Sequence, residues 1–115
     1  MNQRSNNFLF EKNLEWEQPA DGIRRQIMGY DEDIMLVKIL FKRGAVGTPH
    51  THFHVQTTYV AKGVFEVEIN GEKQLLREGD GFYVEPDAQH GVVCVEDGVL
   101  IDVFSPMRKD FLKTM

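Results

Sequence analysis

The sequence has little cysteine and no long apolar run. Its one cysteine, Cys94, has no second cysteine for an internal disulfide, which is consistent with a reducing compartment. The apolar run around it, residues 91–95, predicts a buried structural thiol rather than a nucleophile. No stretch approaches the roughly 18 apolar residues of a membrane span, and the first residues lack the apolar centre of a secretory signal. We therefore expect a cytoplasmic protein with no membrane partner.

Basic residues are also in the minority. The chain has 13 lysines and arginines against 18 aspartates and glutamates, for a formal net charge of −5. The basic residues are scattered, so we expect no nucleic-acid partner, and an anionic ligand would need a local exception to the acidic balance. With 115 residues and no internal repeat, the chain has room for a single core. We expect an N-terminal leader or arm at residues 1–13 and one domain at residues 14–115.

A long helical pattern is missing as well. The chain is a succession of short strand candidates separated by turn residues, at 23–30, 34–41, 46–52, 56–60, 64–69, 82–84, 90–95 and 99–105. Asn70-Gly71 predicts a two-residue hairpin, and Lys62-Gly63 and residues 96–98 predict further breaks. Many short strands without a long helix indicate an all-β fold, either an antiparallel sandwich or a barrel.

Three histidines and a glutamine carry the strongest functional signal. His50 and His52 lie two apart in an extended segment, where such residues point the same way, and Gln56 and His90 come from other stretches. Neutral imidazoles are the commonest protein ligands of transition metals, and three of them with one oxygen donor leave positions free for substrate or water. The pattern predicts a reaction centre with one divalent transition metal, bound by His50, His52, Gln56 and His90.

His54 complicates this assignment. It shares its strand parity with His52, so on an unbroken strand both side chains would point the same way. We expect the chain to bend around residues 53–55, with His54 lining the mouth of the site or facing solvent. The alternative is that His54 replaces Gln56 as a ligand. Nickel, zinc, iron and cobalt suit such a ligand set about equally well, so the sequence does not select among them.

The spacing from Gly44 to Gly63 and from Gly79 to His90 resembles the two motifs of the cupin superfamily. The resemblance implies a double-stranded β-helix, a small jelly-roll-like barrel with a metal in its lumen. Gln56 stands where most metal-binding cupins have glutamate, so the ligand set loses one negative charge. A more electrophilic metal suits Lewis-acid chemistry better than redox cycling. This favours an isomerase or lyase-like reaction over dioxygenation.

A closer resemblance covers nearly everything after the leader. Trp16-Glu17, Gly22-Ile23-x-Arg25, the stretch 44–60 and the tail 96–111 resemble the KdgF family of pectin-degradation cupins. The resemblance implies a homodimer that opens the ring form of 4,5-unsaturated monouronates, which lyases release from pectin or alginate. The product is the linear 4-deoxy-5-ketouronate.

The tail supplies candidates for the chemistry. Asp102 shares a strand face with Leu100 and Phe104, and taken alone it is either a strand-end surface residue or a buried acid. Given the resemblance, we expect Asp102 to act as the acid and base, with a pKa raised by its apolar setting. We expect Arg108 to hold the carboxylate of the sugar during catalysis through a two-pronged hydrogen bond. The alternative is that Arg108 is a solvent-exposed charge in the tail, with no role in the site.

Two further residues complete the predicted substrate site. Phe104 is expected to form an apolar wall against the sugar, although a core position fits it equally well. Gln56 has a second role open to it, which is to orient the substrate instead of binding the metal tightly. Arg25, Tyr59 and Tyr83 are possible residues of the barrel lumen, and they receive no role beyond a structural one.

Two other functions stay open at this point. One is a non-catalytic sugar-binding cupin, for which the chain shows no attached effector segment. The other is a cupin dioxygenase or sugar isomerase, which the glutamine at position 56 and the tail from Asp102 to Arg108 both disfavour.

Overall fold

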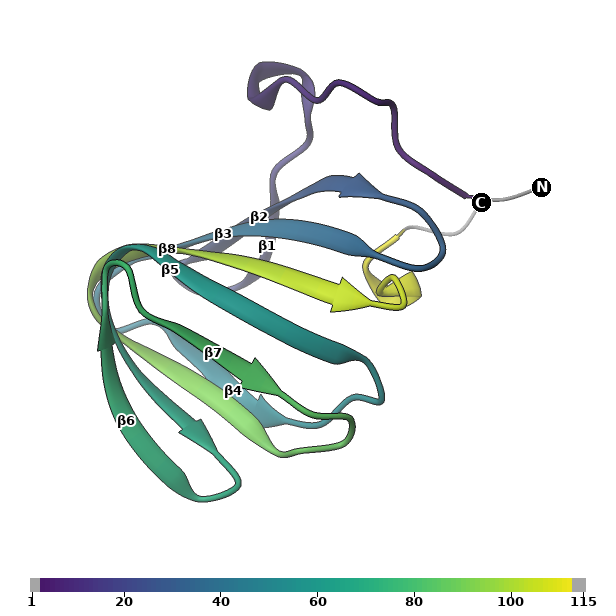
Figure 1. Cartoon of the computed structure of the whole chain (residues 1–115). Helices are drawn as coiled ribbons and strands as arrows, with labels where there is room; N and C mark the ends of the chain where they lie inside the picture. The colour runs from purple at the N-terminus through teal and green to yellow at the C-terminus, as the bar shows by residue number, and fades with distance from the viewer. Residues whose placement is uncertain (1–2, 113–115) are drawn as a thin grey trace.

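Antiparallel strands form one 8-stranded sheet that folds over on itself, with a bend at one end and an opening at the other (Figure 1). The computed structural model describes residues 3–112, so the outer ends of the expected segments 1–13 and 14–115 lie outside the described residues. The elements are η1 (Glu11–Asn13), β1 (Glu17–Ala20), β2 (Ile23–Tyr30), β3 (Met35–Phe41), β4 (Val46–His50), β5 (Val55–Ile69), β6 (Glu72–Arg77), β7 (Gly81–Val84), β8 (His90–Ser105) and η2 (Lys109–Phe111).

The long strands β5 and β8 run through both halves of the sheet and connect them. The strand order is β1-β2-β3-β8-β5-β6, with β4 paired to β8 and β7 paired to β5. The expected all-β, jelly-roll-like single domain is confirmed. Within residues 3–112, no helix is long and apolar enough to span a membrane.

Two glycines build the bend where β5 and β8 cross from one half to the other. A Cβ added to Gly63 would lie 2.4 Å from the carbonyl oxygen of Asp97, and one added to Gly98 would lie 2.5 Å from that of Lys62. Only residues without a Cβ allow the two backbones to approach so closely. The breaks predicted at Lys62-Gly63 and residues 96–98 are therefore wrong, because both strands continue through these positions and bend together.

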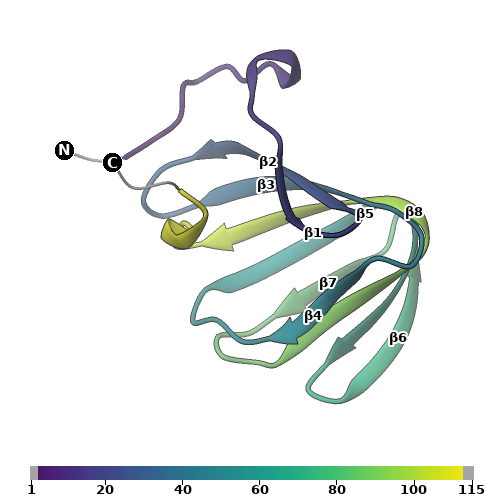
Figure 2. The same cartoon turned by 180° about the vertical axis from the view of Figure 1, so that it is seen from behind.

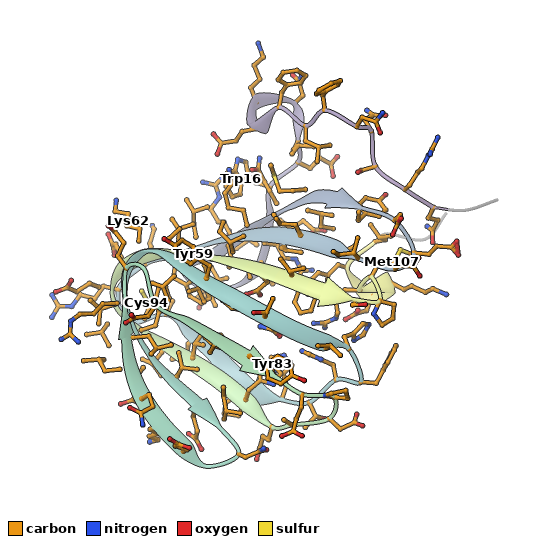
Figure 3. All side chains as sticks on the ribbon, viewed as in Figure 1. Trp16, Tyr59, Lys62, Tyr83, Cys94 and Met107 are labelled. Carbon is orange, nitrogen blue, oxygen red and sulfur yellow. The ribbon has the colours of Figure 1, made fainter. Side chains whose placement is uncertain are left out.

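Apolar side chains fill the space between the two halves of the sheet. Near the bend, the ring of Phe41 meets the ring of Phe65 edge-on at 5.1 Å, and Cys94 packs in the same cluster. Cys94 is 1% exposed, which confirms the predicted buried thiol, and burial raises its pKa. A second cluster around Phe104 and Met107 lies toward the open end, and Figure 3 shows Cys94 and Met107 at opposite ends of the barrel.

The described part of the leader lies along β2, and Figure 2 shows it from behind. The backbone N–H of Ser5 donates to the carbonyl oxygen of Tyr30 at 2.9 Å. The buried side chain of Gln26 donates to the carbonyl oxygens of Glu11 and Leu14 at 3.0 and 3.3 Å. These bonds fix the leader against the outer face of β2 and leave the inner face of that strand to the barrel interior.

Gly63→Ala is expected to destabilise the fold more than Gly71→Ala, which lies in the confirmed Asn70-Gly71 hairpin. Both glycines have φ +86°, so each substitution introduces about 1–2 kcal/mol of left-handed strain. An added Cβ meets nothing within 4 Å at Gly71 but overlaps backbone atoms at Gly63, which adds roughly another 1–3 kcal/mol. Urea unfolding measures the difference, and equal losses of stability would contradict the close crossing of β5 and β8.

Candidate metal centre and active site

Strand pairing brings the three predicted histidines together. His50 ends β4 and is paired with His90, which begins β8, and His52 follows two residues after His50. The ring centroid of His90 lies 4.5 Å from that of His50 and 4.7 Å from that of His52. One ring nitrogen from each residue lies within 4.8 Å of the other two. The three imidazoles therefore form a candidate metal site at the open end of the barrel, where β4 ends (Figure 1).

Backbone carbonyls fix the tautomer of each imidazole. In each ring Nδ1 donates to a carbonyl oxygen two residues away, at 2.9 Å for His50, 3.1 Å for His52 and 2.9 Å for His90. A carbonyl oxygen only accepts, so Nδ1 carries the proton and Nε2 presents a lone pair. Burial lowers the pKa of His52, and it lowers that of His90 to about 4. Both rings are therefore neutral at neutral pH, which is the form that binds metals.

The converging lone pairs fit a bound cation. The Nε2 atom of His90 is buried and has no hydrogen-bond partner within the described residues. Such an atom is costly to bury unless another group binds it. Metal-ligating histidines usually donate their other ring N–H to a carbonyl or carboxylate, as all three do in this structure. The site thus suits the predicted divalent metal, although the donor set does not select its identity.

Gln56 adds its amide oxygen to this group of acceptors. Its Oε1 atom lies 3.0 Å from Nε2 of His52, and its Nε2 atom donates to Oγ1 of Thr58 at 2.9 Å. With the His52 proton on Nδ1, both Oε1 and the facing Nε2 are acceptors, and two acceptors at this distance repel each other unless a cation binds both. The side chain therefore lies where the predicted fourth ligand would be, and its role as a ligand stays a prediction.

His54 does not join the group. It is 6% exposed, so the expectation that it faces solvent is wrong. Its ring stacks on Phe53 at 4.0 Å and lies edge-on to Phe104 at 6.4 Å. The cluster of candidate ligands within residues 3–112 consists of the other three histidines, which favours Gln56 over His54 as the fourth ligand. Burial lowers the pKa of His54 and keeps this ring neutral as well.

Asp102 is buried in the barrel interior, so the alternative of a surface carboxylate is wrong. It is 6% exposed, and β8 places it opposite Thr58 of β5. The hydroxyl of Thr58 donates to Oδ1 of Asp102 at 2.6 Å. Burial raises the pKa of Asp102 to about 6, while the Thr58 hydrogen bond and the charge of Arg108 act in the opposite direction. Hydrogen bonds thus connect the predicted fourth ligand, Gln56, to the acid through Thr58.

Arg108 is buried rather than solvated. It is 8% exposed, and its guanidinium lies 5.0 Å from the ring centroid of Phe104 and 4.1 Å from that of Phe111. Its Nε and Nη2 atoms bind the two carboxylate oxygens of Asp110 at 3.0 and 2.8 Å. We expected Arg108 to make a two-pronged hydrogen bond to the substrate. One edge of its guanidinium instead makes such a bond to Asp110 of the protein. Phe104 contacts both this arginine and the ring of His52. It is therefore a core residue that also borders the site.

One cavity of roughly 270 Å³ connects most of these side chains. Its lining includes six of the seven predicted site residues, namely His50, Gln56, His90, Asp102, Phe104 and Arg108. Apolar side chains such as Ile23, Phe41 and Leu100 form much of the remaining wall. The candidate metal ligands, the buried acid Asp102 and Arg108 therefore face one shared cavity.

Comparison with known proteins identifies the family. Residues 37–104 match the family described as Cupin domain. The chain is 48% identical over 107 residues to the pectin degradation protein KdgF of Dickeya dadantii (strain 3937), covering 91% of this chain and 97% of that protein. The chain is a cupin of the KdgF family. The homodimer that the resemblance implies stays a prediction.

Two solved structures resemble this KdgF-family cupin over nearly their whole length. KdgF from Halomonas sp. is 44% identical, with a TM-score of 0.88 over 94% of this chain and 100% of that one. An RmlC-like cupin from Shewanella frigidimarina NCIMB 400 is also 44% identical, with a TM-score of 0.93 over 96% of this chain and 99% of that one. The high coverage shows that the cupin barrel is shared.

Arg25 lines the cavity, which confirms it as a lumen residue, whereas Tyr59 and Tyr83 are exposed, so a lumen position is wrong for them. Sequence reasoning missed Thr58 in this KdgF-family cupin. Thr58 shares strand parity with Gln56, and that parity is the one signal that indicated an inward side chain. Its pairing with Asp102 depends on the register of β5 against β8, which no local motif specifies. Phe111 contacts Arg25 because the tail folds back onto β2. The two residues are far apart in the chain, so no local pattern predicts this contact.

Removal of one histidine from the cluster is expected to abolish tight metal binding, whereas removal of His54 is not. Loss of a hydrogen bond that supports a metal ligand lowers metal affinity by about 10- to 100-fold. His90→Ala removes a ligand itself, so its affinity for a divalent metal should fall further. His54→Ala is the matched control, since its ring lies beside the cluster without joining it. Equilibrium dialysis followed by elemental analysis measures both. Equal losses in the two variants would show that the ligand set is wrong.

Proposed function

We propose that this cupin is a metal-dependent enzyme that opens the ring of 4,5-unsaturated monouronates from pectin or alginate and yields linear 4-deoxy-5-ketouronate. The observation that carries the proposal is Asp102, a buried acid with a pKa raised to about 6, in one cavity with three converging imidazoles. The printed name of the 48% identical relative, a pectin degradation protein, supports the same class of substrate.

His50, His52, His90 and Gln56 would hold one divalent transition metal, with nickel, zinc, iron and cobalt as the candidates. When bound, the metal supplies Lewis-acid chemistry by polarising an oxygen of the sugar. The ligand set itself is neutral, because a metal-bound imidazole and an amide carry no charge. A bound divalent ion would therefore give the cavity a positive potential that suits an anionic sugar within an acidic protein.

Asp102 is placed to move the protons of the reaction. Ring opening removes a proton from the anomeric hydroxyl while the bond to the ring oxygen breaks, and the resulting enolate takes that proton at carbon four. A carboxyl with a pKa near neutrality can accept the proton and then deliver it. Oδ1 is held by Thr58, whereas Oδ2 has no hydrogen-bond partner within the described residues. Oδ2 is therefore the oxygen that we assign to proton transfer.

Phe104 and Arg108 shape the rest of the substrate site. The ring of Phe104 gives the sugar an apolar wall and limits access of water to the acid. Arg108 keeps N–H donors that do not bind Asp110, so it can still contact the uronate carboxylate. The cavity of roughly 270 Å³ lies slightly below the usual range for small-molecule sites, about 300–1,000 Å³. Its size supports a monosaccharide rather than a polymer as substrate.

The metal-loaded protein is expected to accelerate the loss of ultraviolet absorption from the conjugated double bond of an unsaturated monouronate. Asp102→Asn keeps the size of the side chain but cannot exchange the proton, and we expect it to lower kcat by about 100-fold or more. Loss of absorption no faster than the spontaneous background would refute the enzymatic proposal and leave a sugar-binding cupin. Full activity of Asp102→Asn would refute only the acid and base role.

The pH profile tests the link between Thr58 and Asp102. The reaction begins with the deprotonated carboxylate, so the rate should rise with pH through a midpoint no higher than about 6, because a bound cation lowers the pKa further. The Thr58 hydrogen bond also lowers this pKa, so Thr58→Val should move the midpoint to higher pH. Thr58→Ser keeps a hydroxyl and should retain the original midpoint. A Thr58→Val profile identical to that of the unmodified protein would contradict the assignment.

A further inference from the structure

Arg25 points into the same cavity as the proposed active site. It lies on β2 between Ile23 and Ile27 of the inner strand face, and it lines the cavity together with Asp102 and Arg108. Its position is fixed from two sides. Nε donates to Oε1 of Glu17 at 2.8 Å, and the guanidinium carbon lies 3.8 Å from the ring centroid of Phe111.

Phe111 brings two guanidinium groups to one end of the cavity. The guanidinium carbon of Arg25 lies 3.8 Å from its ring centroid, and that of Arg108 lies 4.1 Å from it. Each guanidinium is paired with one carboxylate, Arg25 with Glu17 and Arg108 with Asp110, so this end of the cavity offers an anionic ligand N–H donors rather than a net positive charge. A guanidinium matches a carboxylate better than an ammonium does, because its planar donors bind both oxygens.

The two arginines differ in the donors that they have left. Arg108 uses Nε and Nη2 on the two oxygens of Asp110, so its charge is closely matched by a carboxylate of the protein. Arg25 makes a single hydrogen bond within the described residues, from Nε to Glu17. Its terminal atoms Nη1 and Nη2 therefore remain as a side-by-side pair of donors, held in place by Glu17 and Phe111.

We propose that Arg25 binds the carboxylate of the uronate through Nη1 and Nη2, with Arg108 as the neighbouring cation. The proposal rests on the proposed function and assigns the group that selects an acidic sugar over a neutral one. Glu17 and Phe111 act as positioning residues, because they hold the guanidinium without touching the reacting atoms. The substrate carboxylate is thereby anchored at the end of the cavity formed by β2 and the tail.

Arg24 provides a matched control on the same strand. Its side chain points to the opposite face of β2, where the guanidinium carbon lies 4.5 Å from the ring centroid of Trp16. Figure 3 shows Trp16 on the leader side of β2, away from the barrel interior. Substitution of Arg24 therefore removes the same charge from the protein without changing the cavity.

The test compares initial rates of Arg25→Met, Arg25→Lys and Arg24→Met on an unsaturated monouronate, with metal-loaded full-length protein and subtraction of the spontaneous reaction. Arg25→Met should raise KM by about tenfold or more, with a smaller change in kcat, because a charged hydrogen bond to substrate is lost. Arg25→Lys keeps the charge without the paired donors and should give an intermediate KM. Arg24→Met should leave KM unchanged.

Each outcome decides the assignment. Equal KM values for Arg25→Met and Arg24→Met, with an active unmodified protein, would overturn the role of Arg25 and leave the proposed function intact. An unmodified protein that does not accelerate the reaction would overturn both. If thermal unfolding shows that Arg25→Met does not fold, Arg25→Gln takes its place, and an unchanged KM in that variant overturns the role equally.

Discussion

The structure depends on three Nδ1–H groups that donate to backbone carbonyls. Each of these hydrogen bonds leaves the lone pair of Nε2 on the inner side of an imidazole, so three lone pairs meet in a small volume. Such an arrangement is unfavourable in itself, because the three acceptors repel each other and the buried Nε2 atom of His90 has no hydrogen-bond partner within the described residues. The fold holds it in place through the pairing of β4 with β8, which sets His50 opposite His90. A bound cation would convert this unfavourable arrangement into a stabilising one.

The pairing of β5 with β8 connects the candidate metal ligands to the acid Asp102. The register of β5 against β8 sets Gln56 opposite Phe104 and Thr58 opposite Asp102, so neighbouring pairs on one strand face carry the ligand and the acid. Because both long strands continue through the bend at Gly63, their inner faces line one interior and not two. The inner faces of the two strands thus carry the predicted ligand Gln56, the acid Asp102 and the ring of Phe104 into one cavity.

Much of this site could be predicted from the sequence, since the parity of His50 and His52 and the alternation around Asp102 are local patterns. The remainder depends on contacts between distant segments. Local turn signals at Gly63 wrongly predicted a break, because a glycine required for close backbone approach resembles a glycine required for a turn. The burial of His54 also depends on how the tail returns to the barrel, which no spacing reveals.

The most direct test of this account is a crystal structure of the metal-loaded protein, with anomalous scattering recorded at the absorption edge of the metal. The account predicts one ion bound by Nε2 of His50, His52 and His90 at about 2.0–2.2 Å, with Oε1 of Gln56 as the fourth protein ligand. The Nδ1 atoms should keep their hydrogen bonds to the backbone. An ion bound through Nδ1, or no ion at this group while the protein holds metal elsewhere, would contradict it.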